Sequence, residues 1–237
     1  ILGDRIMKKI FRVIPSLDCT DLTRAVNLVE QVAASDMVYG YKIGFALGLA
    51  CGIPETVKAI RSVSDKPIIY DHQKGGTDIP DTAPLFADVM STGGVDEAIL
   101  FPLTGPETMK AWIAALKERS IKVIVGSVMT HKAYLMSEGG FIPDTAVKTI
   151  FETARNEGVN AFVVPLTKPE KTEELISQCT FGPDTEFYSP GLGHQQGDAA
   201  RFGFIKRHYL IVGRRLLNAP DPLNWIQSLE KDLSAYI

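Results

Sequence analysis

The fold of this chain is decided by a repeated unit, whose first copy reads Phe11-Arg12-Val13-Ile14-Pro15-Ser16-Leu17 and then Asp21-Leu22-Thr23-Arg24-Ala25-Val26-Asn27-Leu28-Val29-Glu30. The first stretch is apolar and predicts a buried strand, whereas in the second stretch apolar residues recur at helical spacing. Seven more strand-like runs follow at intervals of roughly 25–30 residues, and they cover residues 38–43, 67–70, 98–101, 122–128, 161–165, 186–189 and 209–212.

Eight apolar strands that alternate with helices predict an α/β fold in which a parallel sheet closes into a (β/α)8 (TIM) barrel. An open, doubly wound sheet is the competing interpretation, but no glycine-rich dinucleotide fingerprint follows the first strand. No linker interrupts the chain, so we expect residues 1–237 to form a single domain. An inserted loop is predicted at residues 138–144, and helices are predicted from about Thr145 and over residues 106–120.

The composition is that of an ordinary globular protein, with 45% hydrophobic residues and a net charge of −3. That charge gives no sign of the basic surface that nucleic-acid binding requires, so we expect no nucleic-acid partner. No apolar run reaches the roughly 20 residues of a membrane helix, and the first residues lack the layout of a signal peptide. Cys19, Cys51 and Cys179 are too scattered for a disulfide framework. We therefore expect a cytoplasmic protein without a membrane partner.

Charged residues gather where the predicted strands end, which is where the catalytic residues of a (β/α)8 barrel lie. Asp18 and Lys42 follow the first two strands, and Asp71, Lys74 and Asp78 follow the third. An aspartate after a strand is often only a helix N-cap, and this alternative stays open for Asp18. An alternating array of lysines and aspartates is costly to build, so the pattern favours a catalytic role for Lys42, Asp71, Lys74 and Asp78.

The last two strand ends predict a phosphate site. Residues 189–198 are rich in glycine, which lets backbone N–H groups approach an anion, and Gly213-Arg214 ends the eighth strand with a guanidinium. Loops seven and eight form the usual phosphate site of this architecture, although an ordinary turn and a surface arginine remain the alternative. We expect no metal ligands among the four histidines, because their spacing does not match a metal site: His72, His131, His194 and His208.

The order and spacing of seven motifs resemble the orotidine 5'-monophosphate decarboxylase family, especially its short archaeal and bacterial forms. The resemblance spans most of the chain, and its motifs are Leu17-Asp18, Lys42-Ile43-Gly44, Asp78-Ile79-Pro80-Asp81-Thr82, Met129-Thr130-His131, Ser189-Pro190-Gly191-Leu192-Gly193 with Gln195, Gly197-Asp198 and Val212-Gly213-Arg214.

The resemblance implies decarboxylation of orotidine monophosphate to uridine monophosphate without a metal or an organic cofactor. It implies that Lys74 stabilises the carbanion and protonates it, that Asp71 lies beside the substrate carboxylate, and that Lys42 and Asp78 complete the array. It also implies a homodimer with shared active sites, because Asp78 and Thr82 would reach the neighbouring subunit. The substrate-binding residues that it implies are Asp18, Thr82, Thr130, Gln195, Gly213 and Arg214.

One departure from the family pattern leaves two rival interpretations open. The family spacing Asp-x-Lys-x-x-Asp is expanded here to Asp71-x-x-Lys74-x-x-x-Asp78, so Asp71 and Lys74 cannot share one face of a regular strand. A bulge would have to restore the register, and we expect an active enzyme with an expanded loop. The rivals are a nucleotide-binding barrel that has lost catalysis and a magnesium-dependent sugar-phosphate lyase, although the latter would favour an acidic residue in place of Lys42.

Overall fold

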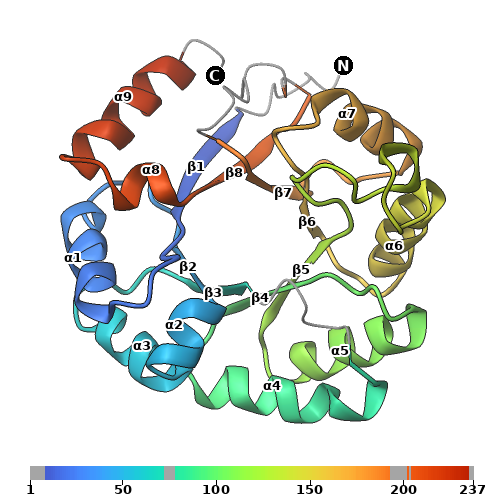
Figure 1. The fold of residues 1–237 in the computed structure, drawn as a ribbon, viewed down its shortest axis with the longest axis horizontal. Helices are drawn as coiled ribbons and strands as arrows, with labels where there is room; N and C mark the ends of the chain where they lie inside the picture. The colour runs from blue at the N-terminus through green and yellow to red at the C-terminus, as the bar shows by residue number, and fades with distance from the viewer. Residues whose placement is uncertain (1–8, 72–77, 193–201, 203, 235–237) are drawn as a thin grey trace, which may run out of the picture.

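The computed structural model describes residues 9–71, 78–192, 202 and 204–234. Eight parallel strands form one sheet in the order β1-β8-β7-β6-β5-β4-β3-β2. They stand around a common axis, and the helices lie outside them (Figure 1). The strands are β1 Ile10–Pro15, β2 Tyr41–Gly44, β3 Ile68–Asp71, β4 Glu97–Leu100, β5 Lys122–Gly126, β6 Ala161–Val163, β7 Glu186–Pro190 and β8 Arg207–Val212.

The sheet closes between its first two strands, which confirms the predicted barrel. Two parallel bridges join Val13 to Val38 and Ser16 to Lys42, and the Leu17 N–H donates to the Lys42 carbonyl at 2.8 Å. The strand predicted over residues 38–43 therefore pairs with β1 at Val38, although continuous pairing with β3 begins only at Tyr41. The open-sheet alternative is wrong, because these bridges join β1 and β2, the two end strands of the sheet order.

The helices also follow the predicted pattern. Asp21 is the N-cap of the first helix, and its carboxylate accepts the backbone N–H of Arg24 at 3.1 Å. Among the described residues, no helix has the length and apolar character needed to cross a membrane. The helices are α1 Leu22–Val32, α2 Phe45–Ala50, α3 Ile53–Arg61, α4 Ala83–Thr92, α5 Pro106–Glu118, α6 Asp144–Asn156, α7 Pro169–Gln178, α8 Arg214–Leu217 and α9 Pro222–Ser234, with 3-10 turns η1 Pro80–Thr82 and η2 Met136–Glu138.

Alternate strand residues build two apolar layers. Phe11 and Val13 point to the layer between strands and helices, while Ile14 belongs to a smaller cluster that also contains Ile69 and Phe101. This division follows from the two-residue period of a strand. His208 on β8 lies in the outer layer, fully buried, with its Nε2 atom 2.7 Å from the Ser189 hydroxyl, and burial lowers its pKa to about 3.

A charged network fills the barrel at the end where the strands begin. Lys122, the first residue of β5, contacts the Glu97 carboxylate at 3.4 Å and forms an ion pair with Glu186. The Tyr188 hydroxyl lies 3.2 Å from an oxygen of each carboxylate, and its ring stacks on Tyr209 with 4.7 Å between centroids. Burial is the main cause that raises the pKa of Glu97. Chemistry with a substrate is therefore expected at the opposite, carboxyl end of the strands.

Candidate active site

A cavity of about 1200 Å³ opens at the carboxyl ends of the strands. It contains six of the residues predicted to form the site, which come from five different strand ends and loops: Asp18, Lys42, Asp71, Thr130, Gly213 and Arg214. Apolar side chains, including Ile99, Phe101 and Val163, complete its wall. The barrel thus brings together residues that lie far apart in the chain, as parallel strands that end on one rim require.

Lys42 lies between two carboxylates in this cavity. Its ammonium is 2.9 Å from Asp71 Oδ2 and 3.2 Å from Asp18 Oδ1. The Lys42 and Asp71 side chains are each 8% exposed, whereas the Asp18 side chain is 50% exposed. The other Asp71 oxygen, Oδ1, is buried and has no hydrogen-bond partner among the described residues. A buried carboxylate oxygen of this kind can accept a further cation or proton donor.

The two carboxylates keep Lys42 charged. Burial alone would lower the pKa of Lys42, but attraction from Asp71, and then from Asp18, outweighs burial and raises the pKa above its usual value. A lysine that stays protonated at neutral pH can donate hydrogen bonds to an anionic or hydroxylated ligand, but it cannot act as a base. This geometry fits the predicted role of Lys42 in holding the charged array together.

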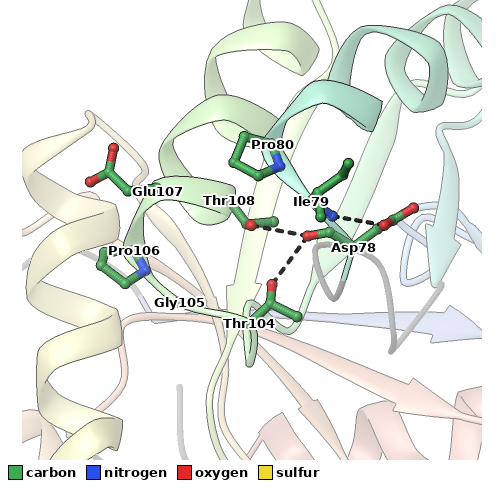
Figure 2. Close-up of a pocket in the computed structure, with 8 residues that line it drawn as sticks. All are labelled: Asp78, Ile79, Pro80, Thr104, Gly105, Pro106, Glu107 and Thr108. Carbon is green, nitrogen blue, oxygen red and sulfur yellow. Dashed lines mark hydrogen bonds between the residues drawn. The ribbon is translucent and has the colours of Figure 1, made fainter.

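Asp78 and Thr82 lie outside this cavity. Asp78 borders a separate cavity of about 400 Å³, together with Thr104 and Thr108 (Figure 2). Its carbonyl accepts the Thr104 and Thr108 hydroxyls at 3.3 and 2.9 Å, and its carboxylate accepts the Ile79 N–H at 2.7 Å. Asp78 is exposed, and Thr82 is half-buried. Within one subunit, the structure therefore does not bring Asp78 to Lys42 and Asp71.

The loops after β5, β6 and β7 meet on the far side of the cavity. The Thr167 hydroxyl donates to the Thr130 carbonyl at 3.2 Å, and Thr167 also packs against Gly191, where an added Cβ would lie 3.0 Å from its methyl group. The Lys168 ammonium binds the Glu138 carboxylate at 2.7 Å and ties the same loops together. Gly191 has a φ of 108°, a conformation that favours glycine.

Several predicted residues lie outside the described part of the chain. These are Lys74 and Gln195, together with His72 and His194. The described residues include no group of three or more histidine, cysteine, aspartate or glutamate side chains that could hold a metal ion. Residues 189–192 of the phosphate-loop motif are described, and Pro190, Gly191 and Leu192 among them line the cavity.

The cavity also contains polar residues that the sequence analysis did not select. Ser16, Lys132, Thr167 and Lys168 line it, and so does Arg215. Only Ser16 had a signal in the sequence: it stands two residues before Asp18, and residues i and i+2 of an extended segment share a face. Lys132, Thr167 and Lys168 lie in irregular loops, where spacing does not determine the direction of a side chain, and Arg215 lies in the short helix α8.

The fold and the site define a class of protein: a (β/α)8 barrel in which a lysine forms ion pairs with two aspartates, in a cavity at the carboxyl ends of the strands. The model of the orotidine 5'-phosphate decarboxylase / HUMPS family matches residues 12–229. The chain belongs to this family.

Relatives and solved structures agree with this family. The orotidine 5'-phosphate decarboxylase of Methanococcoides burtonii is 29% identical over 91% of this chain and 94% of the relative. The same enzyme of Methanocaldococcus jannaschii is 30% identical over 87% of this chain and 91% of the relative. A crystal structure of the latter with the inhibitor BMP is similar, with a TM-score of 0.79 and 27% identity over 95% of this chain and 98% of that chain.

Proposed function

We propose that this protein decarboxylates orotidine 5'-monophosphate to uridine 5'-monophosphate in pyrimidine biosynthesis, without a metal or an organic cofactor. The observation that carries this proposal is the pair of salt bridges from Lys42 to Asp18 and Asp71 in the large cavity. A magnesium-dependent sugar-phosphate lyase needs carboxylate ligands, and the charged lysine at this position would repel the ion. Family membership and the enzymes named above support the same assignment.

The reaction breaks the bond between C6 of the pyrimidine and its carboxylate. Carbon dioxide leaves, and the electron pair stays on C6 as a carbanion with little resonance stabilisation. We assign to Lys74 the stabilisation of this charge and the transfer of its ammonium proton to C6. Asp71 lies beside the departing carboxylate and disfavours the bound substrate relative to the transition state. The Asp71 Oδ1 atom, which has no hydrogen-bond partner among the described residues, supports this arrangement because it offers a hydrogen-bond position for the second lysine.

The remaining cavity residues bind the rest of the nucleotide in this proposal. Thr130 contacts the pyrimidine edge, Asp18 and Lys42 contact the sugar, and Arg214 and Gln195 hold the phosphate beside Gly213. The exposed guanidinium of Arg214 lines the cavity beside Gly191, which supports an anion site at this end. Binding energy from the phosphate can then lower the barrier at C6 as well as hold the substrate.

We also propose a cytoplasmic homodimer in which Asp78 and Thr82 enter the partner's active site. Asp78 is exposed and Thr82 is half-buried, and neither lines the cavity that contains Lys42 of their own chain. Exposed apolar side chains occur on the neighbouring segments: Phe45 and Leu49 on α2, Ile79 next to Asp78, and Leu85 and Val89 on α4. Exposed apolar side chains of this kind are typical of an interface between subunits when they gather on one face. The single eight-stranded sheet further supports one domain for the chain.

The decisive experiment measures the loss of orotate absorbance with orotidine monophosphate as substrate, in excess chelator. We expect turnover that is unchanged by the chelator, with uridine monophosphate and carbon dioxide formed in equal amounts. Lys74→Ala should abolish turnover while uridine monophosphate still binds, and Lys231→Ala, a change on the exposed face of α9, should behave as wild type. Turnover that needs added Mg²⁺, or tight nucleotide binding without turnover, would instead favour one of the two rival functions.

The shared site is tested with hybrid dimers. Lys74→Ala and Asp78→Asn are each expected to be inactive alone. After mixing and reassembly at equal concentrations, about a quarter of wild-type activity should return, because half of the dimers are mixed and each mixed dimer has one intact site. If the mixture stays inactive while mass measurement shows that mixed dimers have formed, the sites are not shared.

A further inference from the structure

Each oxygen of the Asp18 carboxylate accepts a hydrogen bond from the protein. One donor is Lys42, and the other is Ser16, which has no role in the proposed mechanism. The Ser16 hydroxyl donates to Asp18 Oδ2 at 2.7 Å, while Lys42 donates to Oδ1 at 3.2 Å. Ser16 is only 2% exposed, but the Asp18 side chain is half exposed. An exposed carboxylate would rotate freely without such contacts, so the serine fixes the plane in which Asp18 meets a ligand.

The backbone fixes Ser16 itself. Its N–H donates to the Val212 carbonyl at 2.8 Å on one side, and Ser16 forms a bridge with Lys42 on the other. Gly213 packs against both residues, since an added Cβ there would lie 3.3 Å from Asp18 Oδ2 and 3.6 Å from Ser16 Cβ. The seam between β1, β2 and β8 therefore sets the position of the hydroxyl before any ligand binds.

We propose that Ser16 is a positioning residue, which orients the Asp18 carboxylate for the nucleotide. The proposal rests on the proposed function, in which Asp18 binds the substrate. The Asp18 side chain is half exposed, whereas the Asp71 side chain is buried. In this proposal Asp71 acts on the departing carboxylate, and Asp18 binds the substrate and the transition state equally. Loss of such uniform binding raises KM and leaves kcat nearly unchanged. We expect Ser16→Ala to raise KM about 10-fold, equivalent to about 1.4 kcal/mol.

A double-mutant cycle tests whether Ser16 acts through Asp18. The four proteins are wild type, Ser16→Ala, Asp18→Ala and the double variant, each assayed for kcat and KM. In the Asp18→Ala background, Ser16→Ala should change KM less than about twofold, because no carboxylate remains to be oriented. A further 10-fold loss in that background would mean that Ser16 contacts the substrate directly or acts through the fold, and either result overturns the proposal.

The chain offers a matched control in Ser127. This serine follows β5, is fully buried, and its hydroxyl has no hydrogen-bond partner among the described residues. Ser127→Ala should therefore leave KM and kcat unchanged. An equal rise of KM in this variant would show that any buried serine near the rim has the same effect, and the specific role of Ser16 would be lost.

Thermal unfolding of the same four proteins separates this proposal from the proposed function. If wild type neither binds uridine monophosphate nor turns over orotidine monophosphate, the proposed function fails. The unfolding cycle then still decides the contact: the Tm shifts of Ser16→Ala and Asp18→Ala should be less than additive in the double variant. Additive shifts would show that the two side chains do not interact in the folded protein, and the positioning role would be overturned.

Discussion

Adding one methyl group at Gly126 should destabilise the barrel from inside. Gly126 ends β5, and the ring of Phe101, which follows β4, lies directly against it. An added Cβ would lie 2.3 Å from Phe101 Cζ and 2.6 Å from Cε2. Ordinary carbon contacts are about 3.5–4.0 Å, so the ring has to move by more than 1 Å. Phe101 is 2% exposed and packs against apolar residues within the closed barrel, so moving the ring disrupts that packing even if it shifts toward the cavity it lines.

Overpacking of this kind costs about 1–3 kcal/mol, and the lower backbone entropy of alanine in the unfolded chain offsets about 0.4–1 kcal/mol. We expect Gly126→Ala to lower the free energy of unfolding by about 1–2 kcal/mol. For a domain of this size, the Tm should fall by roughly 2–8 °C. Denaturant unfolding gives the free energy, and calorimetry gives the Tm. Because Phe101 lines the active-site cavity, kcat/KM should fall as well.

A second substitution tests the cause. Phe101→Leu removes the atoms that the new methyl group would strike, so the double variant Gly126→Ala/Phe101→Leu should be more stable than the sum of the single effects, by about 1 kcal/mol. Gly182→Ala is the control, since its added Cβ would have no neighbour closer than Thr185 Oγ1 at 3.9 Å, and it should change stability by less than about 0.5 kcal/mol. Additive effects of the two barrel substitutions would refute the reasoning.

Three further predictions concern pH, the loop contacts and the charged network. His208 has a pKa of about 3 in the folded protein, so only the unfolded chain gains its proton below about pH 6.5, and stability should fall by about 1–2 kcal/mol between pH 6.5 and 5. His208→Gln should reduce this slope in denaturant unfolding, and an unchanged slope would contradict the prediction. Thr167→Val should raise KM several-fold by releasing the Thr130 carbonyl, whereas Thr167→Ser, which keeps the hydroxyl, should retain a nearly normal KM; equal values for the two would exclude a role for this hydrogen bond. Lys122→Met should cost roughly 1–3 kcal/mol at neutral pH, because it removes the cation from the buried Glu97 and the partly buried Glu186. The loss should be smaller near pH 5, since burial raises the pKa of Glu97 and favours its protonation; a loss independent of pH would exclude this cause.

Local patterns in the sequence were sufficient for the strands, the helices and part of the site. Apolar runs located all eight strands, because a strand covered on both faces must be apolar along its length. The predicted helix over residues 106–120 is observed as α5, and its apolar residues Met109, Trp112 and Leu116 are buried. Asp18, Lys42 and Asp71 meet at one rim, as the ends of parallel strands must.

The alternative role of Asp18 as a helix N-cap was decided only by the structure. Asp21 caps α1 instead, and Asp18 turns into the cavity toward Lys42. Both aspartates lie between a strand and a helix and have the same local chemistry, so the pattern could not separate them. The path of the chain across the barrel rim separates them, and that path depends on the closure of β1 against β2.

What the sequence by itself determined is therefore the architecture and the placement of charge: eight strand–helix units, and a cluster of lysines and aspartates at the strand ends. The anion site near Arg214 stays a prediction. Only the tertiary structure decided which of these groups touch. It buried Lys42 between Asp18 and Asp71 and placed Asp78 in a separate cavity. The physical reason is that burial patterns act along one strand, whereas distances between loops are set by the way all eight strands close into a barrel.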